Sequence, residues 1–259
     1  MTAASPNPHP TDTRSLRAER ILDAAADLLQ RWGYKRLTMD DVAAAAGIGK
    51  GTIYLHWRTR EALFQAVLDR EVSALITDLG AGVERDPHEA LPHRLARTYY
   101  LKIMQRPLVL AVFTMDREVL GKLWQHEHQR EPQVAELRVE FVQLLQDRRL
   151  MRQDISAQDA AYLFRTLILG YLLAQPFLGN SQPGRERKAD LLALTLQGAL
   201  GLETNPPEEV VSAVADHVRQ LFGQATGPQL MAQITDFTLR PDGDGGSTRN
   251  PTPPTAGLG

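Results

Sequence analysis

The sequence predicts an all-α protein, with a small N-terminal three-helix domain followed by a larger helical bundle. Apolar residues recur at helical spacing between about residues 15 and 239, without the alternating Val/Ile/Thr runs that are typical of strands. Prolines such as Pro92 and Pro107 fall mostly at expected helix ends, where proline is tolerated. The chain has 259 residues and is 43% hydrophobic, which is enough to bury the core of one or two domains.

Charge is distributed unevenly along the chain, although the whole chain has a net charge of only −2. Residues 14–70 contain ten Lys/Arg and seven Asp/Glu, whereas residues 71–259 contain nineteen and twenty-three. The N-terminal segment is therefore the part whose charge suits an anionic partner. The chain contains no cysteine, which excludes disulfides, thiolate zinc sites and a cysteine nucleophile.

The stretch from Leu37 to Leu63 predicts two short helices joined by a tight turn. Thr38 has an oxygen that can cap the first helix, and Gly47 can end it because glycine tolerates the left-handed conformation. A second helix is expected to begin near Lys50, with Ile53 as an inward anchor. This is the helix-turn-helix pattern, whose second helix enters the DNA major groove.

The same stretch resembles the DNA-binding domain of TetR-family transcriptional regulators. The matching residues are Thr38, Ala46-Gly47, Gly51-Thr52-Ile53-Tyr54, His56, Trp57, Arg60 and Leu63. Trp57 stands where Phe is commoner in the family and Arg60 where Lys is commoner. The motif match covers roughly Arg17 to Leu68, and beyond it only length and helical character fit the family.

The outward face of the second helix carries side chains suited to phosphates and base edges. The residues expected to bind DNA are Arg36, Thr38, Lys50, Gly51, Thr52, Tyr54, Leu55, His56 and Arg60. Those expected to reach base edges are Lys50, Thr52, Leu55 and His56. Thr38, Tyr54 and Arg60 are expected to hold the DNA backbone, and Gly51 is expected to let the protein backbone approach it closely.

Residues 1–13 are rich in Pro, Thr, Ser and Asn, and we expect a disordered leader there. A DNA-reaching arm is disfavoured because no basic residue precedes Arg14. Apolar spacing predicts a first helix from Ser15 to Trp32, ending at Gly33. Arg14, Arg17 and Arg20 lie near its start, and the sequence leaves open whether they meet phosphates or only solvent.

The expected domain boundaries follow from these patterns: helix-turn-helix domain 14–60, helical domain 61–240 with a linking helix over 61–79, and a disordered tail over 241–259. The resemblance implies that the linking helix carries ligand-induced motion to the DNA-binding heads. Further helices are predicted at roughly 89–104, 107–127, 131–150, 157–178, 185–202, 207–222 and 228–239.

Large and soft side chains gather in the second domain. Taken one by one, each is best explained as core, but the resemblance implies a ligand cavity between the helices. The candidate ligand-binding residues are Tyr99, Met104, Phe113, Trp124, Phe141, Phe164, Arg165, Tyr171 and Gln175. We expect a moderately large, largely apolar or aromatic effector.

The predicted helices 157–178 and 185–202 are apolar on more than one face, which indicates burial on several sides. The resemblance implies that the last two bundle helices form a four-helix interface in a homodimer. The candidate interface residues are Ala161, Ile168, Leu172, Leu192, Leu196 and Ala199.

No motif indicates catalysis, a cofactor or a metal. His126 and His128 are two residues apart on an expected helix and so point in different directions, which makes them surface residues rather than zinc ligands. No signal peptide is evident, and no apolar run approaches the roughly 20 residues of a membrane span. We therefore expect a cytoplasmic protein.

These patterns together predict a ligand-responsive transcriptional regulator, most simply a repressor released from a palindromic DNA operator by a small effector. The alternative is a helical small-molecule-binding or interaction protein that lacks specific DNA binding. The two differ in whether the protein has salt-dependent DNA affinity.

Overall fold

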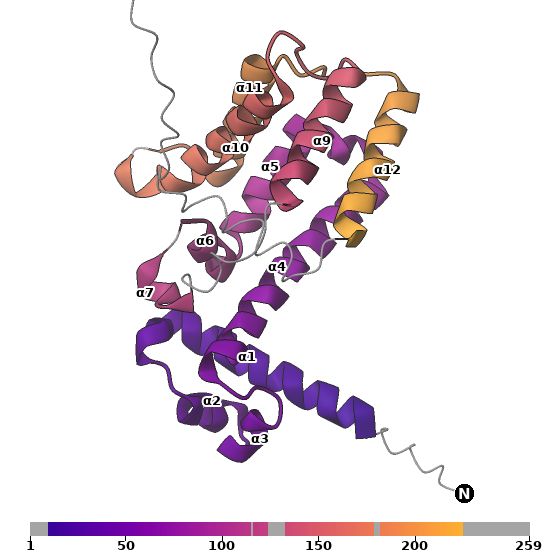
Figure 1. The fold of residues 1–259 in the computed structure, drawn as a ribbon. Coiled ribbons are helices and arrows are strands. Elements are labelled where there is room, and N and C mark those ends of the chain that lie inside the picture. Colours follow the sequence, from indigo (N-terminus) through magenta and orange to yellow (C-terminus); the bar gives the residue numbers. More distant parts are fainter. Residues whose placement is uncertain (1–9, 115, 124–132, 179–181, 225–259) are drawn as a thin grey trace, which may run out of the picture.

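The structure, a computed structural model, describes residues 10–114, 116–123, 133–178 and 182–224. Every regular element in these ranges is a helix. Helices α1–α3 lie at one end of the molecule, and α4 runs from them into a larger group that contains the remaining helices (Figure 1). Within these ranges no helix is both long and apolar enough to cross a membrane.

The N-terminal group consists of α1 (Pro10–Arg36), α2 (Met39–Ala46) and α3 (Lys50–Tyr54). Ile21, Ala25 and Leu29 of α1 are fully buried, and α1 packs against α2 and α4. The helix begins at Pro10, so the last residues of the leader expected over 1–13 are helical. Proline's fixed φ suits the first turn of a helix.

The linking helix α4 (Arg60–Arg85) begins where the side chain of Thr59 accepts a hydrogen bond from the Ala62 amide at 3.0 Å. It runs past the predicted end at residue 79 and includes two glycines. Each glycine costs a helix only about 1 kcal/mol relative to alanine. Val83 on this extension is fully buried, and α12 packs against α4 with Phe222 near Gly80, so this packing offsets the cost.

The larger group contains η1 (Pro87–Ala90), α5 (Pro92–Met104), α6 (Pro107–Thr114), α7 (Arg117–Leu120), α9 (Gln133–Asp147), α10 (Ala157–Leu173), η3 (Gln175–Phe177), α11 (Arg185–Leu200) and α12 (Glu208–Gln224). The prediction of one helix over 107–127 is wrong, because Asp116 accepts hydrogen bonds from the Glu118 and Val119 amides and starts the separate helix α7.

Two other predicted helices are shorter than expected. The segment 89–104 is divided at Leu91, after which Pro92 occupies the first turn of α5. The segment 157–178 leaves the α-helix after Leu173, and a short 3₁₀ turn that contains Pro176 follows. Proline has no amide hydrogen to continue an α-helix. The predicted helix 228–239 and the tail 241–259 lie outside the described residues.

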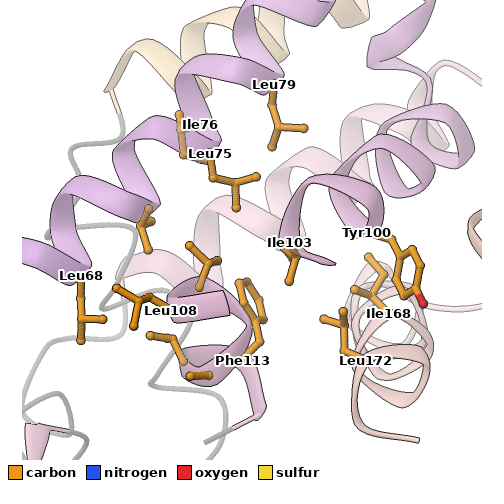
Figure 2. Close-up of a cluster of buried hydrophobic side chains, with 14 of the residues drawn as sticks. Leu68, Leu75, Ile76, Leu79, Tyr100, Ile103, Leu108, Phe113, Ile168 and Leu172 are labelled. Carbon is orange, nitrogen blue, oxygen red and sulfur yellow. The ribbon is translucent and has the colours of Figure 1, made fainter. Parts of the chain in front are cut away.

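The core of the bundle is built on one face of α4. Leu75, Leu79 and Ile103 are buried where α4 meets α5, and α6 and α10 complete the cluster (Figure 2). Further buried members of this cluster are Leu68, Ile76, Tyr100, Leu108, Phe113, Ile168 and Leu172. Because α4 also packs against α1, a single helix connects this core to the N-terminal group.

Helix α12 covers the far end of α4 and also contacts η1. Val211, Val214 and Ala215 are fully buried on its inner face. His88 of η1 lies between two carboxylates, with Nε2 3.2 Å from Glu208 of α12 and Nδ1 3.3 Å from Asp86.

Candidate nucleic-acid interface

The first helix of the helix-turn-helix, α2, is held by the side chain predicted to cap it. The Asp41 amide donates to Thr38 Oγ1 at 3.2 Å, and the Thr38 amide donates back to Asp41 Oδ2 at 2.9 Å. The Thr38 hydroxyl also donates to that carboxylate, at 2.6 Å, and this hydrogen bond lowers the pKa of Asp41. Both donors of Thr38 are thus engaged, so its predicted phosphate contact would require this capping pair to open.

The turn between α2 and α3 has the predicted glycine geometry. Gly47 adopts φ 65° and ψ 39°, the left-handed conformation, and its amide donates to the carbonyls of the last turn of α2. The Ile48 amide donates to the Ala43 carbonyl at 3.0 Å. Ile53, on the inner face of α3, is fully buried. The turn and this anchor fix the direction in which the outer face of α3 points.

Large side chains are exposed on that outer face. Tyr54 is 42% exposed and Leu55, at the C-terminal end of α3, is 76% exposed. Gly51 is exposed as well, and a Cβ added there would meet no heavy atom within 4 Å. The protein's own packing therefore gives no reason for glycine at this position, which is consistent with the predicted close approach of DNA. Thr52 is half-buried beside it.

Lys50 at the start of α3 is paired with Asp40 of α2, with 2.7 Å between Nζ and Oδ2. The hydrogen bond to Asp40 raises the pKa of Lys50, so its amine is charged at neutral pH. Both side chains are largely exposed, and such pairs are weak. The predicted DNA contact of Lys50 is therefore in competition with an internal partner.

His56 follows α3 and lies over Trp57, with ring centroids 5.4 Å apart and an interplanar angle of 29°. Burial lowers the pKa of His56, and the nearby positive charges of Arg14 and Arg17 lower it further. At neutral pH the imidazole is therefore uncharged, which gives it one donor and one acceptor nitrogen for base edges.

Arg60 has an internal role that the sequence did not indicate. Its Nη1 donates to the Leu37 carbonyl at 2.9 Å, and its guanidinium lies 4.1 Å from the centroid of the Tyr34 ring. The Tyr34 hydroxyl donates to Glu61 at 2.6 Å. Arg60 thus ties the start of α4 to the end of α1, and its predicted phosphate contact would use the remaining guanidinium donors. Arg36, at the end of α1, is exposed.

Sequence reasoning missed a joint between the N-terminal group and the bundle, where α1 packs against α7. Gly33 has φ 69° and ψ 164°, and a Cβ added to it would lie 2.5 Å from the Glu118 carbonyl oxygen. A Cβ on Gly121, which has φ 57°, would lie 2.5 Å from Tyr34 Cδ1. Two glycines with positive φ thus allow close contact from both sides. The only sequence signal was Gly33 itself.

The structure brings together some of the predicted ligand-binding residues. Tyr99 and Phe113 meet edge to face, with ring centroids 5.7 Å apart. The Tyr171 hydroxyl lies 3.0 Å from Thr195 Oγ1, and Gln175 donates to the Tyr171 carbonyl at 2.7 Å. The ring pair joins α5 to α6, the Tyr171–Thr195 contact joins α10 to α11, and Gln175 connects η3 to α10. Tyr99, Phe113 and Tyr171 all belong to or pack against the same hydrophobic core.

Other members of the predicted set lie elsewhere. Phe141 stacks on His217 of α12, with ring centroids 5.8 Å apart and the planes 7° from parallel. Met104 and Phe164 are half-buried and pack against the core, and Arg165 is half-buried. Trp124, and the pair His126 and His128, lie outside the described residues. Within the described ranges no cluster of three or more His, Asp or Glu side chains could hold a metal ion.

The predicted dimer residues include a clear error. Four of them are buried inside the subunit and cannot form a surface: Ile168, Leu172, Leu192 and Leu196. Ala161 and Ala199 are half-buried. The exposed apolar side chains of these helices and of the segment between them are instead Tyr162, Leu163, Leu173, Phe177, Leu178 and Leu194.

Comparisons with known proteins agree with this geometry. Residues 21–67 match the family described as bacterial regulatory proteins, tetR family. The N-terminal group is a TetR-family helix-turn-helix domain. The matched segment contains the C-terminal part of α1, all of α2 and α3, and the start of α4.

Named relatives of this chain are transcriptional regulators. The HTH-type regulator AlkX of Mycobacterium tuberculosis is 30% identical over 110 residues, which are 41% of this chain and only about half, 52%, of AlkX. YvkB of Bacillus subtilis is 22% identical over 70% of this chain and 95% of its own length. The crystal structure of SCO4942 from Streptomyces coelicolor superposes with a TM-score of 0.53, 20% identity and coverage of 71% of this chain and 98% of that one. This superposition shows a shared fold.

Proposed function

We propose that this TetR-family protein is a homodimeric transcriptional repressor that acts in the cytoplasm and is released from a palindromic DNA operator by a small, largely apolar effector. The exposed Tyr54 and Leu55, on a short helix anchored by the buried Ile53, support this proposal most strongly. An apolar side chain such as Leu55 is suited to the thymine methyl group in the major groove, and the Tyr54 hydroxyl to a phosphate.

Dimerisation is proposed to use the exposed apolar surface of α10 and α11. Leu194 on α11 is 61% exposed, Tyr162 on α10 is 63% exposed, and Phe177 in η3, after the end of α10, is 85% exposed. A two-fold axis there would present two α3 helices to successive major grooves, which are about 34–36 Å apart. Such symmetry requires a palindromic operator.

The effector is proposed to bind within the helical domain, near the edge-to-face pair Tyr99 and Phe113. Two routes connect that region to the DNA-binding helices: the continuous helix α4, and the α6–α7 segment that abuts Gly33. An effector that favours one spacing of the two heads would lower operator affinity by its differential binding, typically about 1–3 kcal/mol of coupling. The proposed role consists of binding alone and includes no catalytic step.

The proposal is tested by incubating the purified full-length protein with random DNA fragments and sequencing those that it retains, at low and at moderate salt. We expect enrichment of one palindrome, with affinity that falls steeply as salt rises. Repeating the selection with a panel of apolar compounds is expected to identify one class that releases the DNA. If no fragment is enriched at low salt while a compound still raises the melting temperature, the protein is instead a helical small-molecule-binding protein without specific DNA binding.

A further inference from the structure

The face of α1 that packs into the domain changes character toward the N-terminus. Ile21 and Ala25 are fully buried and lie four residues apart on one stripe of the helix. The same stripe continues through Arg17, four residues before Ile21, and Arg14, three residues before Arg17. Arginine thus replaces apolar residues on the inward-facing stripe where α1 extends beyond the domain core.

This arginine segment lies beside the DNA-facing surface. Figure 1 shows α1 continuing past α2 and α3 toward the N-terminus. Arg14 and Arg17 are both close enough to His56, which directly follows α3, to act on its charge. Arg14 lies seven residues before Ile21, about 10 Å along the helix axis. Their positive charge therefore lies near the end of α3 that carries Tyr54 and Leu55.

Two other arginines of this region, Arg31 and Arg70, are held in ion pairs within the protein. Arg70 of α4 binds Glu19 and Asp23 at 3.0 and 2.8 Å, and Arg31 pairs with Asp27 at 2.9 Å. Within the described part of the chain, neither Arg14 nor Arg17 has an ion pair or a hydrogen bond through its side chain. Arg14 is exposed and Arg17 is half-buried.

We propose that Arg14 and Arg17 form a second DNA-contacting segment, in which the first turns of α1 neutralise backbone phosphates outside the base pairs that α3 reads. The inference rests on the proposed function, since it requires α3 to lie in the major groove. The partner is the DNA backbone, because unpaired guanidinium groups bind phosphate oxygens and their charge carries no base sequence information.

The test uses the full-length protein and its selected operator in two lengths, one of them trimmed by several base pairs at each flank. Affinity is measured against salt concentration for the wild type, for Arg14→Ala, for Arg17→Ala and for the double variant. Arg31→Ala is the matched control, because it removes one positive charge from the same helix about 25 Å from Arg14. Arg17→Lys keeps the charge and is expected to keep the contact.

Each alanine variant is expected to reduce the slope of log affinity against log salt by about 0.9 for each bound subunit, the value for one phosphate contact. Trimming the flanks should weaken wild-type binding but leave the double variant unaffected. The inference is overturned if the slope equals that of Arg31→Ala, or if trimming weakens wild type and double variant equally. A wild type that binds neither operator overturns the proposed function itself, which is a distinguishable result.

Discussion

Replacing Gly33 with alanine tests whether the joint between α1 and α7 holds the two parts of the molecule together. Gly33 has φ 69° and ψ 164°, in a region of backbone space that is essentially restricted to glycine. Holding another residue there costs about 1–3 kcal/mol. The new Cβ would also lie 2.5 Å from the Glu118 carbonyl oxygen, which is backbone and cannot rotate away.

The second cost is that of overpacking, which is typically about 1–3 kcal/mol. The two contributions together predict that Gly33→Ala lowers the free energy of unfolding by about 2–6 kcal/mol. A typical domain has a free energy of unfolding of only about 5–15 kcal/mol, so this loss would be easily measured.

The assay is urea unfolding of the full-length protein, followed by circular dichroism. Gly82→Ala is the matched control: Gly82 lies inside α4 and an added Cβ would meet nothing within 4 Å. This control should be neutral or should stabilise the protein by up to about 1 kcal/mol. If Gly33→Ala unfolds at the same urea concentration as Gly82→Ala, the close contact between α1 and α7 is not part of the folded protein.

Three further expectations concern charge, pH and assembly. Asp40→Asn should increase the affinity for DNA severalfold in anisotropy titrations, because it releases Lys50 from its ion pair and removes a negative charge. An unchanged affinity would mean that the Lys50–Asp40 ion pair does not compete with DNA. Burial lowers the pKa of His93, so the unfolded chain binds a proton more readily, and the free energy of unfolding should fall as the pH drops through about 6.5. Urea titrations of His93→Gln should show a smaller fall, the remainder coming from His56, and an unchanged fall would mean that His93 does not contribute. Leu194→Glu should yield folded monomers in sedimentation, whereas Leu192→Glu should lower the melting temperature; a dimeric Leu194→Glu variant would place the interface elsewhere.

Local patterns in the sequence identified the helix-turn-helix because its determinants are close together along the chain. Thr38 and Asp41 are three residues apart and bond to each other, and Gly47 ends α2 through its own backbone geometry. The fold class and the family follow from such short-range signals. The exposed positions of Tyr54 and Leu55 also follow, since the inward-facing Ile53 is their neighbour.

The features that were missed depend on contacts between distant segments. Gly33 meets Glu118, and nothing in either local sequence indicates the other. Leu192 and Leu194 are both apolar on a helix with several apolar faces, so spacing alone could not show that the first is buried and the second exposed. Arg60 has the residue type of a phosphate ligand, but its guanidinium is engaged by partners on α1 and the loop that follows.

The claim that the outer face of α3 binds DNA is tested most directly by measuring the affinity of Lys50→Ala and Tyr54→Ala for the selected operator. Both side chains are substantially exposed, so we expect each variant to unfold at the wild-type temperature. Each should bind roughly tenfold more weakly, the equivalent of about one lost DNA contact. If both variants keep wild-type affinity, α3 is not the recognition helix.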